Sequence, residues 1–339
     1  MFRSAANPII RLVLFPVLLL FYFQSNGDPV PILTPMFVVI FLTMMPSKPP
    51  LKMLLNLLVI LFFISFLLVT IGSILKDTPT GYALFCWSLL FWGFYRSHAN
   101  PKDILATLSL MVVIMMTVMN FQMGISTSFL PSLMFKGVII AIIFTYLSFL
   151  LFPGDEQDIK ADQTSKVGAQ ENVALIAFKA TTMCIVLFVL MSTGSSQTML
   201  IAITIVNIIK IPIAEDNRIY SQNKVITTVV GIFFTLPVLA LFSFGVPTWV
   251  LIGVTLFCGL QLAGYAIRRQ CSFSIYQLLF TNFTVLTYQV IKHQGITSLD
   301  AEFWRLLSIV IAILVSVLIL NLTKHSAKPL VNIKKQNQH

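Results

Sequence analysis

The chain has 339 residues, of which 57% are hydrophobic and only 10% are charged. Soluble proteins carry a charge on roughly a quarter of their residues, so this composition excludes a soluble enzyme or a soluble binding domain. The net charge of +10 does not indicate nucleic-acid binding, because the basic residues are spread over many short loops. The sequence therefore predicts an all-α, polytopic membrane protein whose first partner is the lipid bilayer.

Apolar runs bounded by proline, glycine or charge recur along the whole chain, and a membrane-spanning helix needs about 20 mostly apolar residues. The basic start of the first run is typical of a signal peptide, but no small-x-small cleavage pattern follows it, which favours a first span. The first two runs of each half are short enough to be broken or tilted. Ten spans is the alternative to the twelve that we predict. These are 9–24, 30–46, 52–74, 80–95, 103–121, 132–152, 173–192, 197–213, 224–243, 247–266, 272–291 and 303–323.

One long hydrophilic stretch, 153–172, divides the spans into two sets of six and holds five of the twelve acidic residues. Its composition cannot bury enough apolar surface to fold alone. We therefore predict a first transmembrane repeat at 1–152, a linker at 153–172, a second transmembrane repeat at 173–323 and a basic tail at 324–339. Because each half has an even number of spans, the two six-helix repeats are expected to be parallel.

Short motifs support this internal repeat, because they recur at matching places in the two halves. Lys-Pro-Pro at 48–50, after the second span, recurs as Lys-Ile-Pro at 210–212. Pro-Thr at 79–80, before the fourth span, recurs at 247–248. The two halves are therefore predicted to share one arrangement of spans.

The basic residues also predict the orientation. If the N-terminus is cytoplasmic, 18 of the 22 Lys and Arg fall on the cytoplasmic side, and Lys76, Lys136, Lys292 and Arg305 fall on the other. Such a bias is what the positive-inside rule describes. Both termini and the linker are therefore expected to be cytoplasmic.

No motif indicates catalysis, a cofactor or a metal. There is no phosphate-binding loop, and the four histidines are expected in loops or the tail without metal-ligand spacing. The four cysteines are scattered and are expected to be free thiols. The carboxylates at 215–216 and at 300 and 302 are interpreted as solvated loop charges. We therefore expect no enzyme, although a membrane-embedded transferase is a lesser alternative.

The candidate site residues are polar groups in or near the spans. Lys136 and Arg305 stand one turn into the sixth span of each half and are predicted to attract an anion at the periplasmic mouth of a shared pathway. The alternative is that each side chain carries its charge to the interface. Asn282, Thr284 and Gln289 form a dense polar group in the eleventh span and are predicted to line a cavity. Their alternative role is hydrogen bonding between helices, which contributes about 0.6 kcal/mol on average.

Small residues form one face of the tenth span. Gly253, Gly259, Ala263 and Gly264 are spaced so that a neighbouring helix could approach closely there. Close packing against another span is therefore expected along this face.

The third span of each half carries a further pattern. The second half reads Lys-Val-Ile-Thr-Thr-Val-Val-Gly at 224–231, and the first half has Pro46 followed by Lys52. With the two six-span halves, this is similar to the fusaric acid resistance protein-like superfamily, which includes the aromatic acid exporters. That family's pattern is roughly a Pro-containing loop followed by Arg-x-x-Gly-Thr-x-x-Gly. The second half keeps the basic residue, the threonine and the last glycine.

The resemblance implies a compact bacterial inner-membrane member without a large cytoplasmic domain. Such a protein would be a secondary transporter that exports small aromatic or anionic compounds. The resemblance also implies a periplasmic adaptor as partner, and a homo-oligomer is a further expectation. The alternative function is a non-transporting scaffold or accessory subunit of an export or envelope complex.

Overall fold

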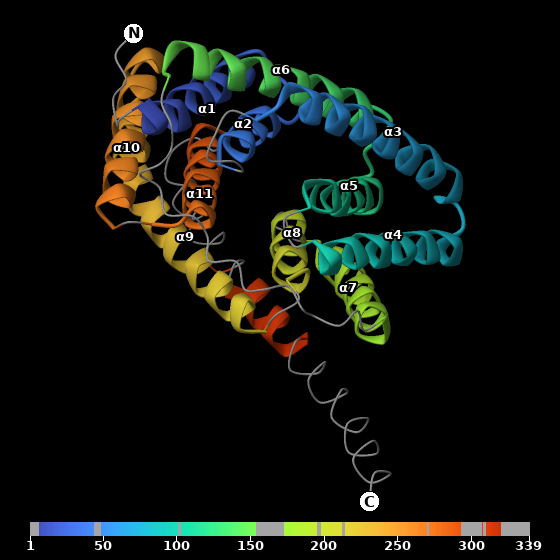
Figure 1. Cartoon of the computed structure of the whole chain (residues 1–339). Coiled ribbons are helices and arrows are strands. Elements are labelled where there is room, and N and C mark those ends of the chain that lie inside the picture. The colour runs from blue at the N-terminus through green and yellow to red at the C-terminus, as the bar shows by residue number, and fades with distance from the viewer. Residues whose placement is uncertain are drawn as a thin grey trace, which may run out of the picture. The chain divides into compact units, whose positions relative to one another are not determined.

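A computed structural model of the chain describes residues 7–43, 49–100, 103–153, 173–194, 198–211, 214–269, 271–292, 307 and 310–319. These residues form helices joined by short turns and contain no β-strand, which confirms the all-α class (Figure 1). The helices are α1 (Asn7–Ser25), α2 (Leu33–Thr43), α3 (Leu51–Leu75), α4 (Pro79–Ala99), α5 (Ile104–Phe121), α6 (Leu130–Leu151), α7 (Val173–Ser192), α8 (Thr198–Ile209), α9 (Ala214–Ser243), α10 (Thr248–Arg268), α11 (Phe273–Lys292) and the apolar segment Val310–Ile319.

Each of these helices falls on one of the twelve expected runs, in the same order. Within the described ranges, seven are long and apolar enough to cross a membrane: those over 7–25, 51–75, 104–121, 130–151, 173–192, 222–243 and 248–268. This is the architecture of a multi-pass membrane protein.

The largest difference from the expected boundaries lies at α9, which begins at Ala214 and not near 224. The ten extra residues contain no proline or glycine, so nothing in their sequence interrupts a helix. Glu215 and Asp216 therefore belong to a helix and not to the loop in which the sequence placed them.

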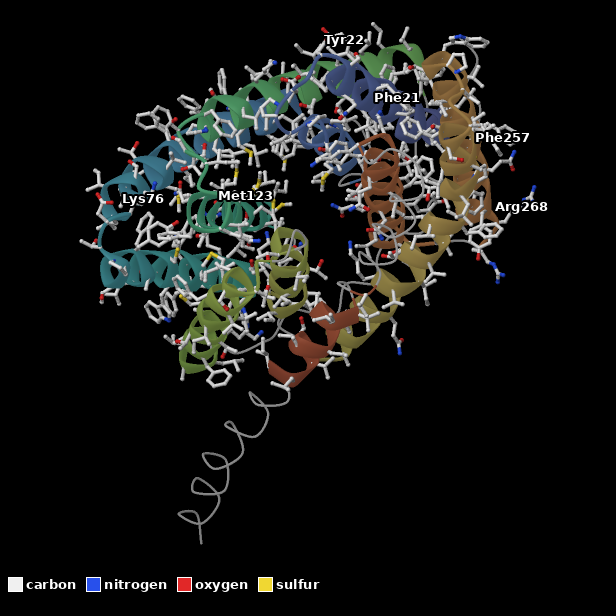
Figure 2. The ribbon with its side chains drawn as sticks, turned by 180° about the vertical axis from the view of Figure 1, so that it is seen from behind. Phe21, Tyr22, Lys76, Met123, Phe257 and Arg268 are labelled. Atoms are coloured by element: carbon white, nitrogen blue, oxygen red, sulfur yellow. The ribbon has the colours of Figure 1, made fainter. Side chains whose placement is uncertain are left out.

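The outer surfaces of the helices carry large apolar side chains. On α1, Tyr22 is 59% exposed whereas its neighbour Phe21 is buried, and Phe257 on α10 is 61% exposed (Figure 2). Phe63 on α3 and Phe233 on α9 are equally exposed. A soluble monomer rarely shows so many large apolar groups on its surface. These exposed apolar side chains are therefore expected to contact lipid acyl chains.

The helices form two compact units, and each unit draws on both halves of the sequence. Unit 1 comprises 1–59, 133–165 and 223–306, and unit 2 comprises 60–132, 166–222 and 307–339. In unit 1, α1 and α2 pack on each other and against α10 and α11. In unit 2, α7 and α8 pack on each other and against α4 and α5. In both units, the first two helices of one half therefore pack against the fourth and fifth helices of the other half.

This interleaving has a consequence for fragments of the chain. Because each unit needs helices from both sides of the linker, fragments 1–160 and 161–339 are each expected to be unstable when expressed alone. When the two are coexpressed with a tag on one, the untagged fragment should copurify and elute with the intact chain on size exclusion. A fragment that is monodisperse by itself would contradict the interleaved packing.

The small face of α10 is packed around Gly259 and Ala263, the latter of which is fully buried. A Cβ at Gly259 would lie 2.5 Å from Val13 Cγ1 on α1 and 3.2 Å from Phe283 Cε1 on α11. Nothing lies within 4 Å of a Cβ at Gly253 or Gly264. The expected close packing is therefore found around Gly259 and Ala263 and not along the whole face.

Candidate functional site

Lys179 places an ammonium group in the interior of unit 2. It lies on α7 and is only 2% exposed. Its Nζ donates to the carbonyl oxygens of Ile209 (2.9 Å) and Ile211 (3.3 Å), and it lies 3.4 Å from His98 Nε2. An ammonium group has three N–H donors, so three uncharged acceptors satisfy it. The hydrogen bonds of this buried cation are complete, but its charge is not neutralised by them.

The contacts of His98 show how the imidazole is arranged. His98 lies in the last turn of α4 and is buried, and its Nδ1 is 3.1 Å from the carbonyl oxygen of Phe94. A carbonyl can only accept, so Nδ1 carries the proton and Nε2 is left to accept from Lys179. The imidazole is therefore neutral in this arrangement. The sequence placed His98 in a loop, and the structure corrects that to a helix end.

The end of α8 explains why a lysine is buried there. Pro212 cannot continue a helix, and α8 ends at Ile209 after only 12 residues. The last carbonyl groups of a helix have no partner within the helix, and the helix dipole makes this end negative. Lys179 from α7 supplies both the donors and the positive charge that this end lacks.

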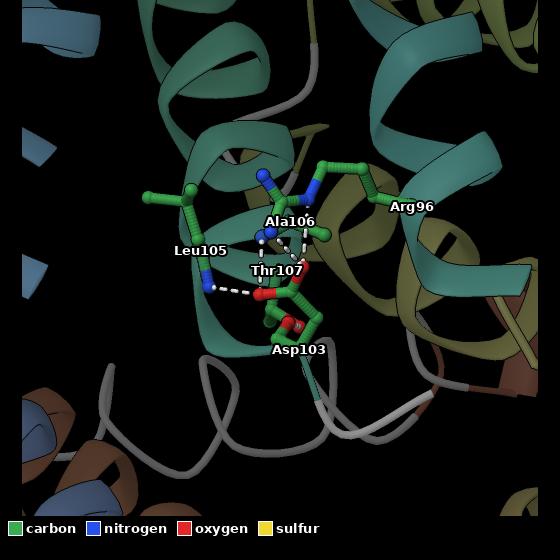
Figure 3. Close-up of polar contacts among 5 residues, drawn as sticks. All are labelled: Arg96, Asp103, Leu105, Ala106 and Thr107. Carbon is green, nitrogen blue, oxygen red and sulfur yellow. Dashed lines mark hydrogen bonds and ion pairs between the residues drawn. The ribbon is translucent and has the colours of Figure 1, made fainter. Parts of the chain in front are cut away.

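Two more cations lie near this end of α8. Lys210 Nζ donates to Thr107 Oγ1 at 2.9 Å. Arg96 binds Asp103, with Nη2 and Nε 2.7 and 2.8 Å from Oδ2 (Figure 3). The other carboxylate oxygen of Asp103 accepts from the backbone nitrogens at the start of α5 (Figure 3). Asp103 is thus held by Arg96 and a helix N-terminus, so we name Arg96, Lys179 and Lys210 the basic cluster of unit 2.

Unit 1 also contains a buried cation in a spanning helix. Arg11 on α1 is fully buried, and its Cζ lies 4.0 Å from the centre of the Phe149 ring on α6. An arginine over an aromatic face is attracted by the ring's electron density. The helices of both units therefore enclose a basic side chain.

Asn282, one of the residues predicted to line a cavity, joins two helices. It is fully buried on α11, and its amide nitrogen lies 3.1 Å from both Thr227 Oγ1 and Thr228 Oγ1 on α9. Its Oδ1 accepts from Lys224 Nζ at 2.9 Å. The polar residues at 224–231 and Asn282 are therefore one network between α9 and α11, which is the alternative role weighed from the sequence.

A glycine lets these two helices approach. A Cβ at Gly231 would lie 2.9 Å from Leu286 Cδ1, which is one turn beyond Asn282 on α11. Any larger residue at 231 would push against Leu286 and strain the hydrogen bonds of Asn282. The last glycine of the family-like pattern thus has a packing role in this chain.

The other two polar residues of α11 differ from each other. Thr284 Oγ1 donates to the carbonyl oxygen of Phe280 within its own helix, at 2.8 Å. Gln289 Oε1 and Thr287 Oγ1 are buried and have no hydrogen-bond partner among the described residues. Gln289 lies seven residues after Asn282, so the two share one face of the helix. Of the three predicted residues on this helix, Gln289 alone keeps unused hydrogen-bonding capacity.

Lys136 is at the surface of unit 1. Its side chain is 58% exposed on α6, and its Nζ lies 3.5 Å from Asp28 Oδ1 and 5.8 Å from the centre of the Phe23 ring. An exposed pair of this kind contributes about 0 to 1 kcal/mol to stability. Arg305 lies outside the described residues, so the pairing of these two cations stays a prediction.

Residues 8–148 match the family model described as "Protein of unknown function (DUF2955)". The match begins in α1 and ends in α6, before the linker. It fits a family of membrane proteins, while the resemblance to exporters rests on the residues at 46–52 and 224–231. No curated protein and no solved structure matches the chain.

Metal ligands and thiol pairs are not gathered in the part of the chain that the structure covers. No three His, Cys, Asp or Glu side chains there lie close enough to hold a metal ion. The four cysteines are free thiols, three of them buried. The polar groups that the structure does bring together are basic side chains and hydroxyl groups.

Proposed function

We propose that the chain is a secondary transporter of a bacterial inner membrane that exports small organic anions, aromatic ones included. What supports this is the charge of the spanning helices. Arg11 and Lys179 are buried in them, and the seven helices that can cross a membrane carry no Asp or Glu. A charge at the bilayer centre costs about 2.5 to 3.5 kcal/mol on insertion scales and is usually functional. Buried basic residues in spanning helices that themselves contain no Asp or Glu favour an anion as the transported species.

The remaining parts of the proposal follow from the sequence. Both termini are cytoplasmic, by the bias of basic residues between loops. Export uses an ion gradient because the chain has no phosphate-binding loop, and the chain itself catalyses no reaction. A periplasmic adaptor and a second copy of the chain are the proposed protein partners.

Transport by inverted membrane vesicles tests this function directly. Vesicles that contain the chain are expected to accumulate radiolabelled benzenesulfonate when a proton gradient is imposed, because inversion turns export into uptake. This anion stays ionised and so does not cross the bilayer by itself. Vesicles without the chain, and the cation tetraphenylphosphonium, serve as controls. Equal uptake with and without the chain, over a panel of sulfonates and carboxylates, would contradict the proposal.

A further inference from the structure

Unit 2 contains a cavity of about 370 Å³ between the last turns of α3 and the loop that joins α5 to α6. Small-molecule sites are usually clefts of about 300 to 1,000 Å³, so the cavity can hold one small ligand. Figure 2 labels Lys76 at the end of α3 and Met123 in that loop. The cavity is lined by Phe66, Val69, Thr70, Ser73, Lys76, Asn120, Gly124, Ser126, Thr127, Ser128 and Pro131.

Asn120 gives this cavity an unused hydrogen-bond donor. It is only 7% exposed, and its Oδ1 accepts from Thr127 Oγ1 at 3.3 Å. Its amide nitrogen is buried, carries two N–H groups and makes no hydrogen bond of normal geometry among the residues described. The Tyr82 hydroxyl donates to Thr117 Oγ1 and also interacts with the Asn120 side chain, and it can accept from one of the two N–H groups only. Buried donors are almost always satisfied in folded proteins, so this nitrogen indicates a ligand that accepts a hydrogen bond.

The charge of the lining selects the kind of acceptor. Lys76 is the only charged residue among those that line the cavity, and it forms no ion pair within the described ranges. Ser126 and Ser128, whose Oγ atoms are 3.1 Å apart, add hydroxyl donors at the rim. One cation with several neutral donors matches a single negative charge on oxygen atoms.

Three of the lining residues are apolar. These are Phe66 and Val69, one turn apart on α3, and Pro131 at the start of α6. α3 is held close to α5 at Gly72, where a Cβ would lie 2.8 Å from Met116 Sδ. The cavity therefore combines apolar lining residues with a lysine and several neutral donors.

We propose that this cavity binds a small organic monocarboxylate, with its carboxylate between Lys76 and Asn120 and its apolar part against Phe66. The site goes beyond the proposed transport function and does not depend on it, because binding can be measured in a protein that transports nothing. In the proposed orientation the cavity lies at the periplasmic end of α3, where an exported anion would leave.

Binding of radiolabelled benzoate to the purified full-length chain in detergent tests the site. Saturable binding is expected, and Lys76→Gln should weaken it by about tenfold to a hundredfold, because a hydrogen bond to a charged group is lost. Asn120→Asp should abolish it, since a carboxylate would then face the ligand's carboxylate. Lys292→Gln is the matched control, because it removes an exposed lysine at the end of α11 in unit 1 and should leave binding unchanged. Absence of saturable binding, or equal binding by all variants, would overturn the proposal.

A second measurement does not depend on the buried amide. Ser128→Cys, in a chain that also carries Cys271→Ser, should react with a charged thiol reagent, and benzoate should slow that reaction. Ser132→Cys, an exposed position on α6 outside the cavity, should react at a rate that benzoate does not change.

Competing ligands identify the chemistry. Benzamide should give no protection, because it lacks the charge. Phosphate or a short-chain phosphatidylglycerol that protects Ser128→Cys better than benzoate does would show a phosphate or lipid-headgroup site and overturn the assignment to a monocarboxylate. Equal reaction rates with and without every ligand would overturn it as well.

Discussion

Gly259→Val is expected to remove a large fraction of the folding stability, whereas Gly253→Val on the same helix is expected to change it little. A Cβ at Gly259 would lie 2.5 Å from Val13 Cγ1 and 3.2 Å from Phe283 Cε1, and both neighbours are only 1% exposed. Contacts this short cannot be accepted without moving α10 away from α1 and α11. Overpacking of this kind typically costs about 1 to 3 kcal/mol, out of a total stability of about 5 to 15 kcal/mol.

The control separates packing from helix propensity. Gly253→Val and Gly264→Val introduce the same side chain into the same helix, but nothing lies within 4 Å of a Cβ at either position. Thermal unfolding followed by fluorescence-detected size exclusion should show a large loss for Gly259→Val and little change for the other two. Val13→Ala should partly restore the milder variant Gly259→Ala, because it removes the methyl groups that clash. Equal unfolding temperatures for all three valine variants would disprove the close contact.

The number and order of the helices could be predicted from the sequence because local features decide them. Long apolar runs have to be helical in a bilayer, where every backbone polar group must be satisfied within the segment. Glycines indicate the turns as well. Gly27, Gly124, Gly194 and Gly245 follow helices and adopt positive φ values of 64 to 69°, a conformation that favours glycine. α7 accordingly begins and ends at the expected residues, 173 and 192.

The pairing of the helices could not be predicted in the same way. A span that is apolar on all sides gives little sign of which neighbour it faces, and only the structure places α1 and α2 against α10 and α11. The small face of α10 illustrates the limit. Gly253, Gly259 and Gly264 are chemically identical in the sequence, yet only Gly259 meets a neighbouring helix.

The contacts of the basic cluster of unit 2 could not be predicted for a related reason. Lys179 and His98 are 81 residues apart, and each resembles an ordinary charge or ring at the end of a span. The available signal was indirect: a short span followed by Pro212 leaves carbonyl groups that need a donor. The sequence places the polar Asn282 within a span, but its partners on α9 depend on how α11 packs. The predicted hydrogen bonding between helices was therefore available only as an alternative.

Lys179→Met is expected to destabilise unit 2 strongly. Methionine has a similar unbranched length and keeps the packing volume, but it removes every donor from the end of α8. The carbonyl oxygens of Ile209 and Ile211 and the Nε2 of His98 would then lose their partner. A buried polar group left without a partner costs about 1 to 3 kcal/mol. The total loss is therefore a large fraction of the stability of a typical domain.

Two further variants distinguish the loss of the Lys179 hydrogen bonds from the general effect of replacing a lysine. Lys136→Met replaces a 58% exposed lysine and should change stability by less than about 0.5 kcal/mol. Lys179→Arg keeps the charge and several donors, so it should retain more stability than Lys179→Met if the carbonyl contacts matter. Urea or thermal unfolding in detergent measures all three variants. If Lys179→Met were as stable as the unchanged chain, the prediction would be wrong. The carbonyl groups at the end of α8 would then accept from water, and the Lys179 ammonium would have no structural role.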